Sequence, residues 1–273
     1  MRYLFLAVIL GAFVPARAAH VDTVDVYSPS MHKSVRTVVI TPEGYTREKT
    51  FPVVYLLHGY GGNHGDYIRN IPSIASDADA YHILIVCPDG RYNSWYFDSP
   101  VDSASRYETF VSQELVHWVD DHYSTVRARA GRAICGLSMG GHGALYLSFR
   151  HQDVYGAAGS MSGGVDLRPF PDNWDLAAQL GDYAHHPDTW DTHSVVNLVY
   201  LLHPHTLPLA LLIDCGTEDF FYTANLHLHQ LLLDRNVPHD FITRPGEHNW
   251  DYWGNSIHYQ LLFFHRFFIG PHA

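Results

Sequence analysis

The chain has 273 residues, of which 47% are hydrophobic and only 16% charged, a composition typical of a globular protein that excludes extensive disorder. Its 28 acidic and 17 basic residues give a formal charge of −11 at pH 7, and no basic run interrupts this balance. Nucleic acid and anionic membrane surfaces are therefore poor candidate partners.

The first residues predict a cleaved signal peptide over 1–19. Arg2 precedes an apolar stretch from Tyr3 to Val14, and the segment 16–18 (Ala-Arg-Ala) has the small-x-small pattern that signal peptidase recognises. The stretch is too short to span a bilayer, so we expect no membrane anchor. The sequence predicts an exported protein, periplasmic or secreted.

The first half of the chain begins with strand patterns. Residues 21–30 and 33–42 alternate apolar and polar side chains, which predicts an antiparallel hairpin. Residues 52–59 and 82–90 are continuous apolar runs, typical of strands buried on both faces. Between them, residues 66–78 have the pattern of a helix.

The central elements alternate in type. Residues 106–123 have a helical apolar stripe that turns Glu114 and Asp120 outward. A short strand over 132–136 follows, and then a helix over 140–151.

The last third continues this alternation. After a strand that ends within 157–164, residues 165–206 are rich in Pro, Asp, His and Trp and have no clean period. The remaining predicted elements are a strand over 207–216, a helix over 223–236, a strand over 239–246 and a helix over 253–268. We therefore predict an α/β protein with a mostly parallel central sheet, helices on both faces and an antiparallel N-terminal hairpin. Its single domain spans 20–273, with an irregular insertion at about 165–206.

The positions of the cysteine and histidine residues predict neither a disulfide nor a metal site. Cys87, Cys135 and Cys215 end or follow apolar runs, so buried thiols are expected rather than a disulfide. The 21 histidines show no HExxH pattern and no other metal-ligand spacing. We expect no metal and no cofactor.

The stretch "GLSMG" (136–140) contains the strongest motif. A phosphate-binding loop would need a lysine after its glycines, and none follows. The G-x-S-x-G pattern instead lies between a predicted strand and a predicted helix, which is the setting of a nucleophile elbow. Ser138 is the predicted nucleophile.

A serine nucleophile needs a base and an acid that orients the base, in the chain order Ser, acid, His. Asp219, in the loop after the strand 207–216, is the preferred acid, and Asp214 within that strand is the rival. His248, in the loop before the last helix, is the preferred base. His142 lies on the helix that Ser138 begins, where its ring would lie over the turn rather than beside the hydroxyl.

The turn 57–62 (Leu-His-Gly-Tyr-Gly-Gly) follows an early buried strand. Such a turn supplies one amide of an oxyanion hole, and the residue after the nucleophile, Met139, supplies the other. The amide of Tyr60 is preferred, with Gly59 or Gly61 as alternatives. His58 in the same turn is a candidate substrate contact.

Two aromatic sets, 93–97 and 250–253, are candidates for a substrate pocket. Trp95 and Trp250 are the predicted contacts, although aromatic residues at such spacings also build protein cores.

Together, "LLHGYGG", "GLSMGGHGA", "CGTEDF" and "GEHNW" resemble the putative-esterase family of α/β-hydrolases. This family includes feruloyl, acetyl-xylan and tributyrin esterases, S-formylglutathione hydrolases and mycolyltransferases. The resemblance spans nearly the whole chain after residue 19. It implies Ser138, Asp219 and His248 as a catalytic triad, the amides of Tyr60 and Met139 as the oxyanion hole, and ester hydrolysis without a cofactor.

The expected function is that of an exported serine carboxylesterase. Its predicted substrates are feruloyl, acetyl or other short acyl esters, as small molecules or on oligosaccharides. The alternatives are an S-formylglutathione hydrolase-like thioesterase, an acyltransferase of the same fold, and a catalytically silent carbohydrate-binding relative. Neither the acyl group nor the oligomeric state follows from the sequence.

Overall fold

The structure is a computed structural model that describes residues 18–270. The predicted signal peptide, apart from its last two positions, lies outside the described residues. Within the described range, no helix is long and apolar enough to cross a membrane.

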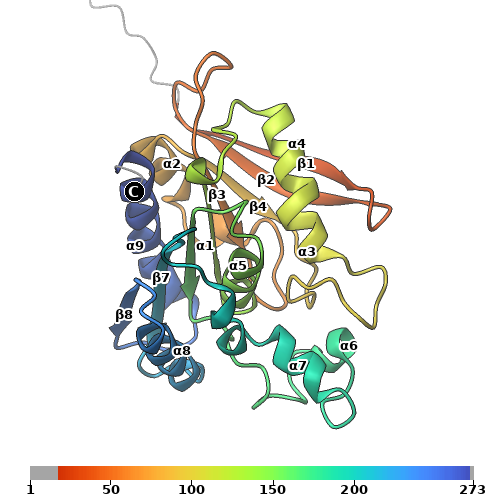
Figure 1. The fold of residues 1–273 in the computed structure, drawn as a ribbon. Coiled ribbons are helices and arrows are strands. Elements are labelled where there is room, and N and C mark those ends of the chain that lie inside the picture. Colours follow the sequence, from red (N-terminus) through yellow and green to blue (C-terminus); the bar gives the residue numbers. More distant parts are fainter. Residues whose placement is uncertain (1–17, 271–273) are drawn as a thin grey trace, which may run out of the picture.

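A sheet of eight strands forms the centre of the molecule (Figure 1), in the order β1-β2-β4-β3-β5-β6-β7-β8. The strands are β1 (His20–Ser28), β2 (Lys33–Thr41), β3 (Val53–Leu57), β4 (Leu84–Pro88), β5 (Arg132–Leu137), β6 (Ala157–Met161), β7 (Ala210–Gly216) and β8 (Asp240–Arg244). β1 pairs antiparallel with β2, and β2 antiparallel with β4. All other neighbours are parallel. The predicted sheet and its N-terminal hairpin are thus confirmed.

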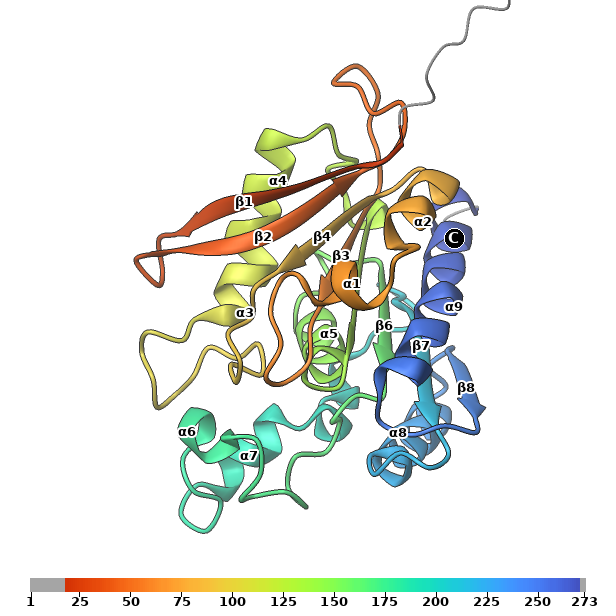
Figure 2. The same cartoon turned by 180° about the vertical axis from the view of Figure 1, so that it is seen from behind.

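Helices cover both faces of this sheet, as predicted (Figures 1 and 2). One face packs against α4 (Leu115–His122), α5 (Met139–Arg150) and α8 (Tyr222–Asp234). The other face packs against α1 (Asp66–Asn70), α2 (Ile74–Tyr81) and α9 (Trp250–Ile269). The remaining helices are α3 (Tyr107–Thr109), α6 (Leu176–Leu180) and α7 (Pro187–His193).

The central strand β3 shows why its sequence is an unbroken apolar run. Val53, Tyr55 and Leu57 belong to one core layer, and Val54 and Leu56 belong to the other. All five side chains are completely buried. Because successive strand residues point to opposite faces, both layers of helices require apolar residues here.

The predicted helix over 66–78 is wrong as a single element, because the structure divides it into α1 and α2 around Ile71–Ser73. Pro72 explains the break. Proline disfavours the helical conformation in the residue before it, and Ile71 has a ψ of 83°, outside the helical region.

The helical prediction over 106–123 is correct, but Asp120 does not point outward. Its side chain is buried, pairs with Arg132 at the start of β5 and accepts a hydrogen bond of 2.6 Å from the Thr125 hydroxyl. Residues 110–114 form a π-helical turn within this stretch, between α3 and α4.

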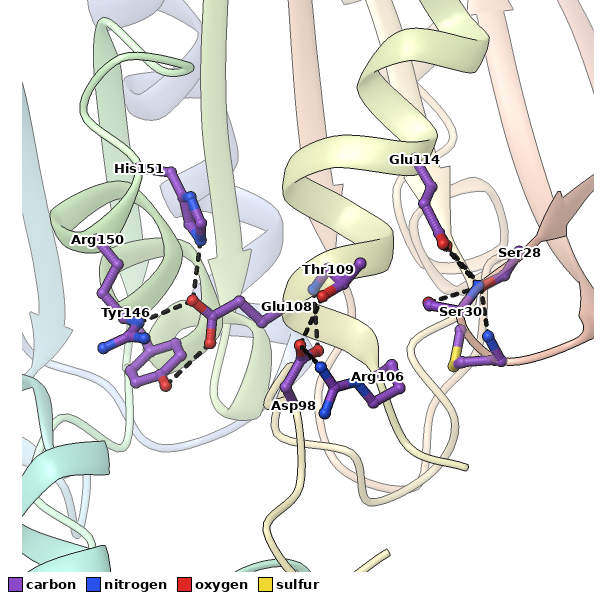
Figure 3. A network of polar contacts seen from close by, with 11 residues as sticks. Ser28, Ser30, Asp98, Arg106, Glu108, Thr109, Glu114, Tyr146, Arg150 and His151 are labelled. Carbon is purple, nitrogen blue, oxygen red and sulfur yellow. Dashed lines mark hydrogen bonds and ion pairs between the residues drawn. The ribbon is translucent and has the colours of Figure 1, made fainter. Parts of the chain in front are cut away.

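A buried carboxylate on α3 anchors the helix that begins after Ser138. Figure 3 shows Glu108 accepting hydrogen bonds from Tyr146 (3.1 Å), Arg150 (2.8 Å) and His151 (2.9 Å), at the end of α5. Burial alone would raise the pKa of Glu108, but the hydrogen bonds from His151 and Arg150 outweigh it and lower this pKa to about 2.

We expect Glu108→Gln to lower the free energy of unfolding at pH 7 by about 2–4 kcal/mol, because it removes one partner of a buried charge network. A carboxylate with a depressed pKa stabilises the fold above its unfolded pKa, and this contribution disappears as pH falls from about 4.5 to about 2. Urea unfolding of both proteins at pH 7 and pH 3 tests this: the difference at pH 3 should be about half or less. An equal difference at both pH values would contradict the assigned role.

The irregular stretch 165–206 connects β6 to β7 and carries the short helices α6 and α7, which lie beyond the strand ends rather than on a face of the sheet (Figures 1 and 2). The three cysteines are free and buried, as predicted, and burial raises the pKa of each thiol.

Candidate active site

Ser138 occupies a sharp turn between β5 and α5, at the carboxyl end of a central strand. Its φ of +55° lies in the left-handed region, which costs a non-glycine residue about 1–3 kcal/mol. Its backbone N–H donates to the carbonyl oxygen of Met161 (2.9 Å), which holds the turn against β6. The local geometry is that of a nucleophile elbow.

The glycines of this turn are required by close backbone contacts. A Cβ on Gly136 would lie 2.3 Å from the carbonyl oxygen of Gly140. A Cβ on Gly140 would lie 2.1 Å from the carbonyl oxygen of Leu57, at the end of β3. The turn after β3 and the Ser138 turn therefore touch through their backbones.

We expect Gly140→Ala to destabilise the protein by at least about 1–3 kcal/mol, because the new methyl group meets backbone that cannot move aside. The matched control is Gly254→Ala in α9, where a Cβ would find nothing within 4 Å. The control should be slightly stabilising, since alanine is the better helix former. Thermal unfolding compares the two, and equal behaviour would refute the steric argument.

His248 joins Ser138 to Asp219 by hydrogen bonds. Its Nε2 lies 2.8 Å from Ser138 Oγ, and its Nδ1 lies 2.8 Å from Asp219 Oδ2. The Asp219 side chain is fully buried, and its Oδ1 accepts the N–H of Phe221 at 2.8 Å. The structure thus brings together three residues that are spread over 110 positions of the sequence, from Ser138 to His248.

Asp214, the rival acid, is engaged elsewhere. Its fully buried carboxylate accepts from Arg244 Nη2 (2.6 Å) and from the hydroxyl of Tyr252. These contacts tie β7 to β8 and α9. The same strand ends hold the acid and base loops together, because the N–H of Glu218 donates to the carbonyl oxygen of Gly246 (3.0 Å).

Two backbone amides remain available beside Ser138. In the described part of the chain, neither the Tyr60 N–H nor the Met139 N–H has an acceptor. The alternative donor Gly61 is already committed, because its N–H donates to the carbonyl oxygen of Tyr92 (2.7 Å). A Cβ on Gly59 would lie 3.4 Å from Ser138 Cβ, so this turn adjoins Ser138. Met139 also begins α5, whose amino end favours negative charge.

The structure does not place His58 where a substrate can reach it. The ring is only 1% exposed, its Nδ1–H donates to the carbonyl oxygen of Gly59 (2.8 Å), and its Nε2 accepts the N–H of Gly90 (2.7 Å). Burial lowers the pKa of His58 and favours this neutral form. Both nitrogens therefore hold the turn rather than a ligand.

Trp95 is likewise buried, at 1% exposure, and its Nε1–H donates to the carbonyl oxygen of Trp174 (3.2 Å). Trp95 therefore supports the segment around Trp174, and its buried ring has no exposed face that a substrate could contact. Trp250 is half-buried and reaches His248 only through Trp253, whose ring meets the imidazole edge-to-face at 4.8 Å. A substrate contact at Trp250 stays a prediction.

Sequence reasoning missed the aromatic residues that stand beside the histidine. The Phe220 ring lies 4.3 Å from that of His248 and is 53% exposed. Trp174, from the irregular segment, stacks on Phe220 at 5.7 Å. Phe220 follows Asp219 in the sequence, and this adjacency is a signal that could have identified it. No comparable signal in the sequence points to Trp174.

His142 is not brought to the Ser138 hydroxyl. Its ring is fully buried, its Nε2–H donates to the carbonyl oxygen of His193 (2.8 Å), and burial lowers its pKa to about 3. It is a neutral core residue. Within the described residues, no group of three or more His, Cys, Asp or Glu side chains is arranged to hold a metal ion.

Comparisons with known proteins identify the family of this chain. A family model described as putative esterase matches residues 28–264. An esterase of Mycobacterium tuberculosis is 35% identical over 134 residues, which cover 48% of this chain but only 29% of that protein. An acetyl esterase of Caldicellulosiruptor saccharolyticus is 23% identical over 253 residues, covering 86% of this chain and 94% of the relative.

The solved structure of a ferulic acid esterase is 28% identical, covers 92% of this chain and 100% of its own, and superimposes with a TM-score of 0.78. This likeness identifies the sheet and its helices as an α/β-hydrolase fold. Because the family model spans most of the sequence, the protein belongs to the putative esterase family of α/β-hydrolases.

Proposed function

We propose that the protein is an exported serine carboxylesterase that acts through an acyl-enzyme. The observation that supports it most is the hydrogen-bonded chain from Ser138 Oγ through His248 to Asp219. An ionised carboxylate only accepts hydrogen bonds, so Nδ1 of His248 carries the proton. Its Nε2 then has a free lone pair for the serine proton.

In the first half of the reaction, Ser138 Oγ attacks the ester carbonyl carbon while His248 removes its proton. The amides of Tyr60 and Met139 stabilise the oxyanion that forms, a contribution worth about 10²–10³ in rate per donor. His248 then protonates the leaving alcohol, which leaves the acyl group on Ser138. Water, deprotonated by His248, releases the acid and restores the serine.

The aromatic surface beside His248 supports aromatic acyl groups as substrates. Phe220 exposes a ring face next to His248, and Trp174 extends this surface. The relatives include an acetyl esterase and a ferulic acid esterase. We therefore propose acetyl and feruloyl esters, free or on oligosaccharides, as the substrate class. Export rests on the signal-peptide pattern of residues 1–19.

A fluorophosphonate probe tests the mechanism directly, because it phosphonylates only a serine that a base activates. We expect labelling of one residue, located by peptide mass spectrometry at Ser138, together with hydrolysis of p-nitrophenyl acetate. A panel of methyl ferulate, acetylated xylan fragments and a glutathione thioester then separates the esterase from the thioesterase reading. Absence of both labelling and turnover would refute the proposal.

We expect Phe220→Ala to lower kcat/KM for methyl ferulate by about 2–10-fold, the loss of one aromatic contact of about 0.5–1.5 kcal/mol. Turnover of p-nitrophenyl acetate should change less, because the acetyl group is too small to cover the ring. Phe220→Leu, which keeps an apolar side chain, serves as the matched control. Equal losses for both esters would show that Phe220 acts on His248 rather than on the acyl group.

A further inference from the structure

A cavity lies at the end of the sheet where the parallel strands begin, opposite the end that carries Ser138. It has a volume of about 300 Å³ and lies where β5 and β7 begin, beside the end of α9 that is marked C in Figure 1. Its apolar lining comes from Leu202, Pro204, Pro208, Leu209, Val237 and Pro238. The 20-residue helix α9, about 30 Å long, separates this cavity from the loop that carries His248.

The polar side chains of this mainly apolar cavity are Arg129, Arg266 and His203, and neither arginine has an acidic partner among the described residues. Arg129 donates through Nε to the carbonyl oxygen of Gln152 (2.9 Å) and through Nη2 to that of Pro208 (2.8 Å). Burial lowers its pKa, and within the described chain the hydrogen bonds of its guanidinium go to backbone carbonyl oxygens and not to a carboxylate. The exposed guanidinium of Arg266 has no hydrogen bond or ion pair to any described residue. No described residue that lines the cavity is acidic.

Other arginines of this protein, whose net charge is −11, pair with aspartates, as Arg91, Arg132 and Arg168 do. A half-buried cation without a counterion is costly, and the planar guanidinium matches a carboxylate in two-point geometry. Leucine, proline and valine offer a smooth aliphatic wall, and the volume is at the lower end of ligand-binding cavities. Inorganic phosphate would leave this wall uncovered.

We propose that this cavity binds a medium-chain aliphatic carboxylate. The hydrocarbon tail occupies the apolar interior, and the carboxylate lies between the guanidinium groups of Arg266 and Arg129. The site is separate from the esterase centre and does not depend on the reaction proposed there.

Isothermal titration of the full-length protein with sodium decanoate, below its micelle concentration, tests the proposal. We expect saturable binding with one site per chain and a decanoate-dependent rise in Tm. Decan-1-ol, which has the same tail without the charge, should bind at least about tenfold more weakly, since it cannot form a charge-assisted hydrogen bond to a guanidinium. Inorganic phosphate should not bind.

Two variants localise the site. Arg266→Gln should weaken decanoate binding about tenfold or more, because the exposed guanidinium has no structural contact to lose. Ala130→Phe should block binding by filling the cavity that Ala130 lines. Arg235→Gln is the matched control: this exposed arginine at the end of α8 also lacks a described ion pair but lies outside the cavity.

Several results would overturn the proposal. One is the absence of decanoate binding to the wild-type protein. This holds also if sedimentation shows that the protein is a dimer whose interface covers the cavity. Another is undiminished binding to both Arg266→Gln and Ala130→Phe, which would place the ligand elsewhere, for example beside Ser138. Equal weakening in Arg235→Gln would indicate general attraction to positive charge.

Discussion

Ser138→Ala is expected to lower kcat for p-nitrophenyl acetate by about 10⁵–10⁶-fold, the loss seen when a serine hydrolase loses its nucleophile. The hydroxyl removed is the group that His248 Nε2 contacts at 2.8 Å. Without it no acyl-enzyme forms, and only the oxyanion-hole amides and substrate binding can still contribute to the rate. Turnover is measured by p-nitrophenol release after removal of any wild-type contaminant.

Ser148→Ala provides the control on the same helix. Ser148 is buried in α5 like the nucleophile turn, but its hydroxyl donates only to the carbonyl oxygen of Leu145 (3.1 Å), one turn before it. Its removal should leave kcat within about twofold, as expected of a residue whose contacts are local to its helix. A Ser138→Ala protein that keeps more than a few per cent of wild-type turnover would transfer the nucleophile to another residue.

The parts of the fold that sequence reasoning predicts correctly are those that local chemistry determines. The five buried residues of β3 must be apolar because helices cover both faces of the strand, and an unbroken apolar run records this. The glycines at 136 and 140 can likewise be predicted from the sequence motif, since a Cβ at either position would collide with neighbouring backbone. The α/β sheet and the sharp turn at Ser138 follow from these signals.

Predictions fail where contacts come from distant parts of the chain. Trp95 belongs to an aromatic set that predicted a substrate contact, yet its indole is buried and bonded to Trp174, which lies 79 residues away. Asp120 has the spacing of an outward residue, but Arg132 begins a neighbouring strand and draws it inward. The periodicity of a single helix or strand carries no information about a distant partner such as Trp174 or Arg132. The single-domain organisation, the signal peptide and export remain predictions.

The aromatic residues beside His248 show the same limit. Trp174 has a φ of +50° in a segment without helical or strand period, and it is placed by its stacking on Phe220 and its bond to Trp95. A loop whose position depends on three separate elements carries little local signal. Specificity is therefore the feature least accessible from the sequence.

The two aspartates at the end of β7 should behave differently when each is made neutral. Asp219→Asn is expected to lower kcat about 10⁴-fold with little change in unfolding free energy, since an asparagine amide favours the wrong tautomer of His248. The shape of the side chain and its hydrogen bond from the N–H of Phe221 are kept. The measurement is kcat together with the urea midpoint.

Asp214→Asn should give the opposite pattern, because its carboxylate neutralises Arg244 rather than orienting the base. Leaving that guanidinium without its buried partner is expected to cost about 3–5 kcal/mol of unfolding free energy. The loss of kcat in the protein that remains folded should be far smaller than for Asp219→Asn, because the 2.8 Å contact between Asp219 and His248 is unchanged. The opposite result, in which Asp214→Asn removes activity and Asp219→Asn leaves it intact, would make Asp214 the acid of the triad. That assignment would conflict with the contacts that hold Asp214 to Arg244 and Tyr252.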